Sequence, residues 1–280
     1  MQTIDDQLLA TVTGAGGTGP LSGDVKQKLR GMAVTYHTMH TGKDVQAQFP
    51  KLEMIASFGV GYDHIDSAYA REHNIVVTNT PDVLTEEVAD VAMGLLIATL
   101  REFVKADKYL RSGLWQTHNY PLSVGSLRDR KVGFIGMGRI GQAIARRLEA
   151  SRVPVVYHSR KPAPGVSYQH YPDLIEMAKA VDTLIVIVPG GASTSKIVNA
   201  DVLKALGPRG VLINVARGSV VDEPALVAAL KSGIAAPSPS AQADRFAAIA
   251  PGQVFLNAAA QSAIGTTVKS IDIQYGARQH

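Results

Sequence analysis

The sequence predicts an α/β protein whose main domain is built on a parallel, doubly wound sheet. From Lys131 onward, short β-branched runs alternate with helical patterns. The strand-like runs are almost wholly apolar, as expected for strands covered by helices on both faces. Repeated β-α units of this length connect parallel strands. The expected strands are 131–136, 153–159, 182–189 and 210–216, and the expected helices are 141–151, 171–181, 199–207 and 222–233.

The rest of the chain adds elements around this alternating segment. Residues 85–111 form one long helical pattern with a threonine cap and an acidic first turn, and its middle is apolar on nearly every side. We expect this helix to be buried between layers or subunits. Earlier strands are expected at 51–59 and 74–81. In the last helix, Asp222 is expected at the N-cap and Gly233 just past the C-terminal end.

Composition bounds the class of protein. The chain has 280 residues, of which 46% are hydrophobic and 19% charged, enough for two domains or one large one with a sizeable core. The net charge of +4 is mildly basic and suits an anionic ligand or an ordinary surface, whereas nucleic-acid binding would need the charge gathered on one face. Cysteine is absent, which excludes disulfides and thiolate chemistry. The apolar runs are too short to span a bilayer, so we expect a cytoplasmic protein without a membrane partner.

The strongest motif is a glycine turn between a strand and a helix. Gly136, Gly138 and Gly141 fit the pattern G-x-G-x-x-G, directly after one predicted strand and directly before a helix. In such a Rossmann-type turn the first glycine permits the tight bend, the second lets the backbone approach a pyrophosphate, and the third lets helix pack on strand. The helix N-terminus then attracts the phosphates. A second literal match, at residues 14–19, opens no helix because Pro20 follows, so we interpret it as a flexible loop.

The residues after the next strand indicate which dinucleotide is bound. An NAD site places a carboxylate about 20 residues beyond the first glycine to bind the ribose 2′-hydroxyl. Here the strand ends in Ser159, Arg160 and Lys161, and no carboxylate is present. Arginine and lysine pair with a 2′-phosphate that a carboxylate would repel. The sequence therefore favours NADP(H) over NAD(H), although two solvated surface cations are the alternative.

Four separate segments of the chain match one family's motifs in order. They are ASFGVGYDHID (56–66), VTNTPDVLTEEVADVAMGLLIATLRE (77–102), GFIGMGRIGQAIARRLEA (133–150) and LINVARGSVVDEPALVAALKSG (212–233). These segments resemble the D-isomer-specific 2-hydroxyacid dehydrogenases, above all their NADPH-dependent glyoxylate/hydroxypyruvate reductases. The resemblance runs from about Leu52 to Gly233 and fails beyond it.

This resemblance implies a domain organisation and a reaction. Residues 1–98, completed by 266–280, are expected to form a smaller flavodoxin-like substrate domain, and residues 99–265 the dinucleotide-binding domain. The family usually forms homodimers. Its reaction transfers hydride from a reduced nicotinamide to the keto carbon of a small 2-oxo acid. An arginine holds the substrate, and a protonated histidine beside a glutamate donates the proton.

Site residues carry over only where this sequence matches the family motifs. Arg217 matches the catalytic arginine, and Val60 and Gly61 match the loop whose backbone N–H groups receive the substrate carboxylate. The remaining matches are cofactor-contacting positions. They are Thr85, Gly136, Met137, Gly138, Arg139, Ile140, Gly141, Ser159, Arg160, Lys161, Val188, Pro189, Val215 and Ala216, and a faint echo of the family pattern beyond Gly233 adds Asp244.

The family's acid is missing from its expected place. No histidine lies between His170 and His280, and the only glutamate after Arg217 is Glu223. A faint alignment sets Ala247 at the glutamate position and Ala259 at the histidine position. A substitute is conceivable at His64 or His118, and less so at His280.

Three interpretations stay open. The first is a reductase of glyoxylate or hydroxypyruvate whose activity is impaired by loss of the acid, because a positioned acid accelerates the reaction about 10²–10⁴-fold. The second is a catalytically silent NADP(H)-binding sensor or partner-binding protein. The third is that the sequence after Gly233 has been altered relative to a natural chain, because it is rich in Ala, Pro and Ser and poor in periodicity.

Overall fold

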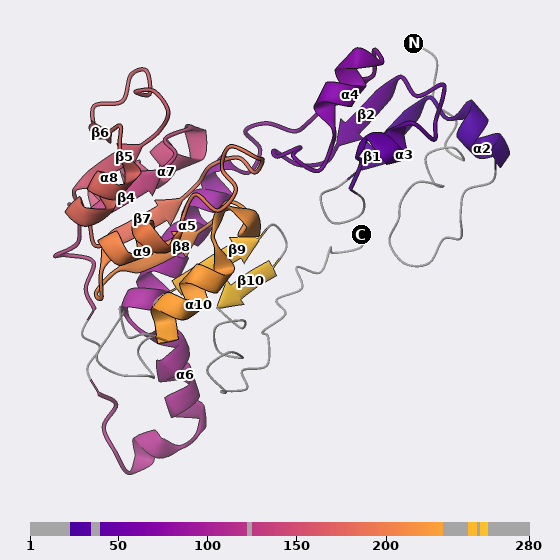
Figure 1. Ribbon diagram of the computed structural model, residues 1–280. Helices are drawn as coiled ribbons and strands as arrows, with labels where there is room; N and C mark the ends of the chain where they lie inside the picture. The colour runs from indigo at the N-terminus through magenta and orange to yellow at the C-terminus, as the bar shows by residue number, and fades with distance from the viewer. Residues whose placement is uncertain (1–22, 35–39, 122–124, 232–245, 251–252, 257–280) are drawn as a thin grey trace. The chain divides into compact units, whose positions relative to one another are not determined.

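The structure is a computed structural model that describes residues 23–34, 40–121, 125–231, 246–250 and 253–256 (Figure 1). The chain divides into two compact units, Met1–Leu84 and Thr85–His280. The expected domain boundary at 98/99 falls inside helix α5 (Thr85–Leu100), whose buried side chains belong to the core of the second unit. The expected return of residues 266–280 to the first domain lies outside the described residues, as does the glycine-rich loop at 14–19.

The first unit is a small α/β layer. Its three strands pair in parallel in the order β1-β2-β3, and the two strands expected from the sequence are β2 and β3. The hydrophobic core gathers around Ile55, which is fully buried in the middle strand. The elements are α2 (Gly23–Lys28), β1 (Gly31–Val34), α3 (Lys43–Gln46), β2 (Met54–Ser57), α4 (Ser67–Glu72) and β3 (Val76–Thr78).

The second unit contains a seven-stranded sheet in the order β10-β9-β8-β7-β4-β5-β6. All neighbours pair in parallel except β10, which runs antiparallel to β9. Numbered along the chain, β4 to β9 follow the order 3-2-1-4-5-6 of a Rossmann sheet. The strands are β4 (Val132–Ile135), β5 (Val155–His158), β6 (Gln169–Tyr171), β7 (Thr183–Val186), β8 (Val211–Asn214), β9 (Phe246–Ala250) and β10 (Gln253–Leu256).

Helices cover both faces of this sheet because successive strand residues point to opposite sides. In β7, Ile185 packs into the core shared with α5 and α7, while Leu184 and Val186 pack into the core shared with α8, α9 and α10. The predicted doubly wound α/β class is thereby confirmed (Figure 1). The remaining elements are α6 (Phe103–Arg111), η1 (Leu114–Gln116), α7 (Arg139–Ala150), α8 (Leu174–Ala180), α9 (Ala200–Leu206), η2 (Gly218–Val220) and α10 (Glu223–Lys231).

The single helix expected over 85–111 is wrong at one point. The chain forms α5 and then α6, and Glu102 between them takes the left-handed conformation with φ of 54°. The apolar middle of α5 packs against α7, as the expected burial requires, whereas α6 has no buried residue. At the start of α10, Asp222 accepts a 3.5 Å hydrogen bond from the backbone N–H of Ala225, in the expected capping position.

Four of the described strands were not predicted from the sequence, and the first of them is β1 in the small sheet. The edge strand β6 begins before the residues assigned to a helix at 171–181, and β9 and β10 lie in the segment that lacks periodicity. In addition, none of the helices in the described ranges is long and apolar enough to cross a membrane.

Two glycines of the second unit should respond oppositely to alanine. Gly94 lies within α5 with nothing near the place of a Cβ, so Gly94→Ala should stabilise the protein by about 0.5–1 kcal/mol. Gly136 has a φ of +102° and no room beside the Ile187 carbonyl, so Gly136→Ala should destabilise it by about 1 kcal/mol or more. Thermal unfolding midpoints of both variants check this, and shifts of the same sign would contradict it.

Candidate functional site

Four loops follow neighbouring parallel strands at one edge of the large sheet. Backbone hydrogen bonds continue the ladder past the strand ends and hold these loops side by side. They run from Gly136 N–H to the His158 carbonyl at 2.9 Å, from Ile187 N–H to the Ile135 carbonyl at 3.0 Å, and from Val215 N–H to the Val186 carbonyl at 3.1 Å. The strand order reverses between β4 and β7, and ligands bind at such a switch point in open α/β sheets.

The glycine turn between β4 and α7 has the geometry that its three glycines require. Gly136 takes a φ of +102°, and a side chain there would meet the Ile187 carbonyl. At Gly141 a Cβ would lie 2.9 Å from the Gly136 carbonyl oxygen, so this glycine lets α7 pack closely on the turn. At Gly138 nothing lies within 4 Å of a Cβ position. The open face of the turn is therefore at Gly138.

The N-terminus of α7 fits a dinucleotide pyrophosphate. Gly138 is its N-cap residue and places no side chain over the first turn, which contains Arg139 and Ile140. A side chain of α7 stabilises the glycine turn, because Gln142 donates a 3.3 Å hydrogen bond to the carbonyl of buried Met137. First-turn N–H groups and the positive end of the helix dipole bind phosphate oxygens at such termini.

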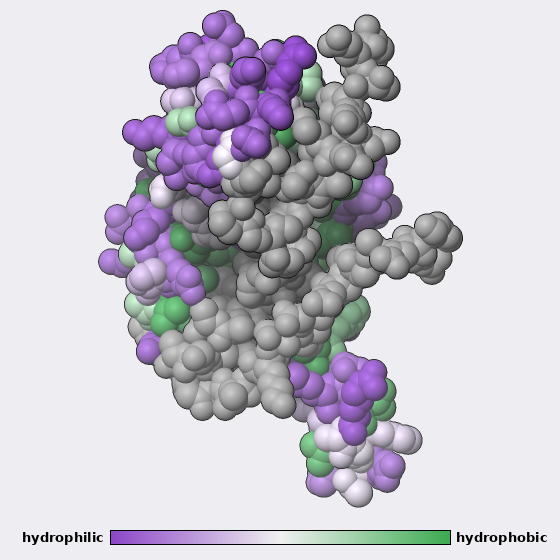
Figure 2. All heavy atoms as spheres, turned by 90° about the vertical axis from the view of Figure 1, so that its right-hand side faces the viewer, coloured by the Kyte–Doolittle hydropathy of each residue, from purple (hydrophilic) through white to green (hydrophobic). Residues whose placement is uncertain are grey.

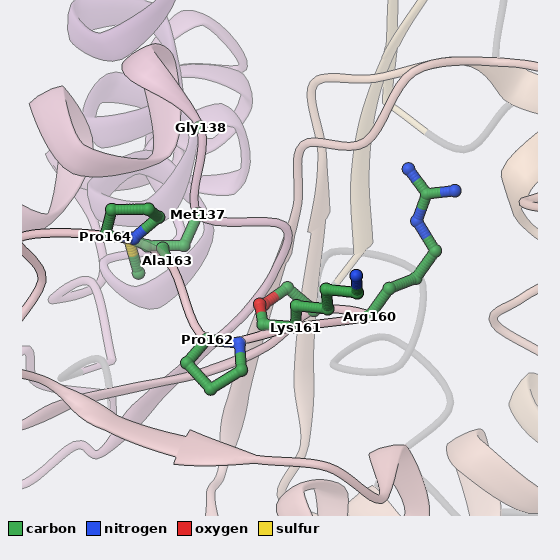
Figure 3. A pocket seen from close by; sticks show the side chains of 8 residues that line it. Met137, Gly138, Arg160, Lys161, Pro162, Ala163 and Pro164 are labelled. Carbon is green, nitrogen blue, oxygen red and sulfur yellow. The ribbon is translucent and has the colours of Figure 1, made fainter.

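A pocket of about 600 Å³ joins this turn to the loop after β5. Figure 3 shows Met137, Ala163 and Pro164 together on one side of the pocket, while Arg160 extends its guanidinium away from them. Its lining residues are Met137, Gly138, Ser159, Arg160, Lys161, Pro162, Ala163 and Pro164.

The charge of this pocket is positive. Its lining contains two cations and no carboxylate, and both Arg160 and Lys161 are exposed. Within the described ranges neither cation forms an ion pair. Their charges are therefore available to an anionic ligand.

The loops after β7 and β8 carry the remaining cofactor positions of this edge. Val188 lies against the glycine turn, with its Cγ1 2.9 Å from the Cβ position of Gly136. The Pro189 carbonyl accepts a 2.6 Å hydrogen bond from the Thr194 hydroxyl. After β8, Val215 and Ala216 are buried. Thr85 is the first residue of α5, the helix that packs along α7.

Arg217 follows directly, and an asparagine that the sequence analysis missed fixes its backbone. The buried side chain of Asn214, the last residue of β8, accepts a 3.0 Å hydrogen bond from the Ala216 N–H and donates a 2.9 Å bond to the Arg217 carbonyl. The Arg217 guanidinium donates to the Ala216 carbonyl at 3.0 Å. One polar residue at the end of an otherwise apolar strand was the available signal.

The loop expected to bind a carboxylate lies in the first unit. Val60 and Gly61 follow β2 and are partly exposed. The Asn79 side chain, after β3, donates a 2.9 Å hydrogen bond to the Val60 carbonyl, and the Thr80 N–H donates to the Gly59 carbonyl at 3.0 Å. These bonds fix the loop at the carboxyl end of the small sheet.

The candidate substitutes for the missing acid lie in different surroundings. His64 is 4% exposed within the first unit, and its backbone carbonyl accepts a 2.8 Å hydrogen bond from the Thr41 N–H. His118 is exposed after η1, where its Nδ1 lies 2.8 Å from the Thr117 hydroxyl. Ala247 is part of β9, in register with Ile213. Asp244, Ala259 and His280 lie outside the described residues.

The sheet order, the glycine turn and the basic pocket together are typical of an NAD(P)-binding domain. The family model "D-isomer specific 2-hydroxyacid dehydrogenase, NAD binding domain" matches residues 93–237. The chain belongs to the D-isomer specific 2-hydroxyacid dehydrogenase family.

Its relatives include plant and bacterial reductases. The chain is 47% identical over 184 residues to a hydroxyphenylpyruvate reductase of Plectranthus scutellarioides, covering 66% of this chain and 58% of the relative. It is 46% identical over 194 residues to glyoxylate/hydroxypyruvate reductase A of Arabidopsis thaliana, covering 69% and 62%. The chain thus spans about three fifths of the length of these relatives.

A solved structure gives the same result for the fold. The NADPH-dependent glyoxylate/hydroxypyruvate reductase of Sinorhizobium meliloti, in complex with NADP and malonate, superposes with a TM-score of 0.73 at 56% identity. The match covers 77% of this chain and 66% of that one.

Filling the open face at Gly138 should weaken dinucleotide binding without unfolding the protein. Gly138→Ala adds a methyl group that meets no protein atom, at a φ of −79° that alanine tolerates. We expect an unchanged unfolding midpoint and at least about tenfold weaker NAD(P)H binding, or about 1.4 kcal/mol. Titration of the bound dinucleotide's fluorescence measures the affinity. Gly94→Ala, on α5, is the matched control, and equal affinities of the two variants would contradict the assignment.

Proposed function

We propose that the protein reduces a small 2-oxo acid, glyoxylate or hydroxypyruvate, to the D-2-hydroxy acid with NADPH. The observation that carries this proposal is the position of Arg217, on the loop after β8, at the same carboxyl edge of the sheet as the glycine turn after β4 and with β7 between them. The names of the relatives agree with this substrate class, since they include reductases of glyoxylate, hydroxypyruvate and hydroxyphenylpyruvate.

The chemistry divides among groups of this chain. Bound NADPH supplies the hydride. The Arg217 guanidinium holds the carboxylate and keto oxygen of the substrate, since arginine pairs with planar oxyanions through two parallel hydrogen bonds. In the first unit, we assign carboxylate binding to the backbone N–H groups of Val60 and Gly61, the positions that match the family's carboxylate-binding loop. Asn214 keeps the arginine backbone in place, so that little ordering is required when the substrate binds.

The preference for NADPH rests on the loop after β5. The 2′-phosphate of NADPH is negatively charged, and the carboxylate that an NAD site places at this position would repel it. Arg160 and Lys161 line the pocket beside the glycine turn, and the lining contains no acidic residue. We assign the 2′-phosphate to these two side chains.

The proton transfer to the substrate lacks the histidine that the family uses as its donor. No histidine occurs in the sequence between His170 and His280. Of the two earlier candidates, His64 is buried in the first unit and His118 is exposed beside η1. We propose that water protonates the developing alkoxide, so that turnover is about 10²–10⁴-fold slower than with a positioned acid.

The missing acid also favours a second function. A protein that binds NADPH firmly and turns over nothing would act as a sensor or partner-binding module. It shares the glycine turn and the basic pocket with the enzyme, and differs from it only in the absence of turnover.

We further propose that the protein works as a homodimer in the cytoplasm. The segment formed by α6 and η1 supports a second copy as the partner, because its large apolar side chains are about half exposed: Phe103 at 54%, Leu110 at 55%, Leu114 at 48% and Trp115 at 56%. Figure 2 shows hydrophobic and hydrophilic residues side by side at its lower end, where Figure 1 places α6.

Apolar area that a second copy covers should be sensitive to polar replacement. We expect the protein to sediment at twice the mass of one chain, and the double variant Leu110→Ser, Trp115→Ser to sediment as a monomer. Leu84→Ser, at a residue 44% exposed in the first unit, is the matched control and should remain dimeric. A monomeric wild type, or a double variant that stays dimeric, would contradict the assigned surface.

Substrate reduction should depend on the arginine at one end of β8 and not on the arginine at the other. We expect slow NADPH oxidation with hydroxypyruvate and glyoxylate, faster than with NADH. Arg217→Ala should lower kcat/KM by about 10²-fold or more, because a charge-stabilising donor is lost. Absorbance of the reduced cofactor measures the rate.

The control for this assay is Arg209→Ala, which removes an exposed cation just before β8, at the opposite end of the strand. Its rate should equal that of the wild type. Rapid turnover that Arg217→Ala leaves intact would sink the proposed role of Arg217. Cofactor binding without any turnover would place the binding-module function first.

A further inference from the structure

The loop that carries Arg160 and Lys161 forms hydrogen bonds at its beginning, in its middle and near its end. At its beginning, the Ser159 carbonyl oxygen lies 2.9 Å from Nε2 of His170. Within it, the Ser159 hydroxyl donates a 2.6 Å hydrogen bond to the Lys161 carbonyl. Near its end, the Ala163 N–H donates a 2.9 Å hydrogen bond to the hydroxyl oxygen of Tyr157.

Two of these contacts come from side chains that the cofactor motif does not include. Tyr157 in β5 and His170 in β6 are paired in register across neighbouring parallel strands. Their rings are 5.1 Å apart at 51°, and the tyrosine is 1% exposed. A carbonyl can only accept, so Nε2 of His170 carries the proton and donates it to Ser159.

The contacts from Tyr157 and His170 are partly buried, whereas the side chains of both cations are exposed. The carbonyls of Ser159 and Lys161 both accept hydrogen bonds from within the protein, while Arg160 and Lys161 expose their side chains. Pro162 and Pro164 restrict the backbone further, because the ring fixes φ. A loop ordered before the ligand arrives loses less freedom on binding.

We propose that His170 and Tyr157 are positioning residues for selectivity toward the 2′-phosphate of the dinucleotide. They act through the loop backbone and do not touch the phosphate. The inference rests on the proposed NADPH preference and adds to it. The charge of the two cations is then insufficient for full selectivity, because selectivity also needs the backbone conformation that these two side chains hold.

The test compares two nucleotides that differ only in the group concerned. Adenosine 2′,5′-bisphosphate carries the 2′-phosphate and 5′-AMP lacks it, and calorimetric titration of the full 280-residue chain gives both dissociation constants without any turnover. Selectivity is the ratio of the two constants. We expect the wild type to bind the bisphosphate at least about tenfold more tightly, since charge-assisted hydrogen bonds to phosphate are strong.

Four single variants separate positioning from general damage. Tyr157→Phe and His170→Met each remove one anchoring hydrogen bond, and each should lower the selectivity about 3- to 10-fold with 5′-AMP affinity unchanged. His170→Gln places an amide N–H near the former Nε2 and should restore selectivity. Tyr168→Phe is the matched control, because it removes a partly buried tyrosine hydroxyl that bonds Glu149 of α7.

The outcomes distinguish this inference from the proposed function. If the wild type does not discriminate, both the NADPH preference and the inference are wrong. If the double variant Arg160→Ala, Lys161→Ala loses selectivity while Tyr157→Phe and His170→Met keep it, only the inference is wrong. An equal loss of affinity for both nucleotides in those two variants, or failure of His170→Gln to restore selectivity, also overturns it.

Discussion

The close contact between the turn after β4 and the backbone after β7 is the constraint on which this site depends. A side chain at Gly136 would meet the Ile187 carbonyl, so the two loops lie together only because glycine is there. From that contact the ladder continues outward on both sides, through His158 and through Val215. One edge of the sheet thereby aligns the pyrophosphate turn, the basic pocket and the arginine loop. The relative positions of these three loops therefore depend on the register of the strands more than on any single side chain.

Much of this edge could be predicted from the sequence because its signals are local. Glycines at fixed spacing between a strand and a helix allow one geometry, and the structure has it at Gly136, Gly138 and Gly141. The buried parallel strands could be predicted because their sequences are apolar runs. Residues 85–111 read as one helix because their periodicity is continuous, yet Glu102 adopts a left-handed conformation that periodicity does not report. Short edge strands such as β6 are too brief to show a period.

The hydrogen bonds that hold the loop with Arg160 and Lys161 could not be predicted from the sequence, and the reason is different. His170 is eleven residues from the carbonyl that it holds, and its pairing with Tyr157 exists only once β5 and β6 lie in register. The same holds for Asn214, whose two hydrogen bonds form only when the chain bends after β8. Sequence patterns identify which residues can contact a ligand. The residues that hold those contacts in place depend on tertiary structure.

The proposed loss of the acid has an energetic consequence that follows from where the proposed site residues lie. Most of the groups proposed to orient the dinucleotide, and the arginine proposed to hold the substrate, lie between β4 and η2, where hydrogen bonds within that segment fix the loops. Orientation of reactants contributes up to about 7–11 kcal/mol to a bimolecular step. A positioned general acid contributes about 10²–10⁴-fold, which is about 3–5 kcal/mol. The larger contribution therefore depends on the segment from β4 to η2. On the proposed assignment, cofactor binding and orientation can persist without a positioned acid, so the proposed slow reductase and the alternative binding protein differ only in the proton step.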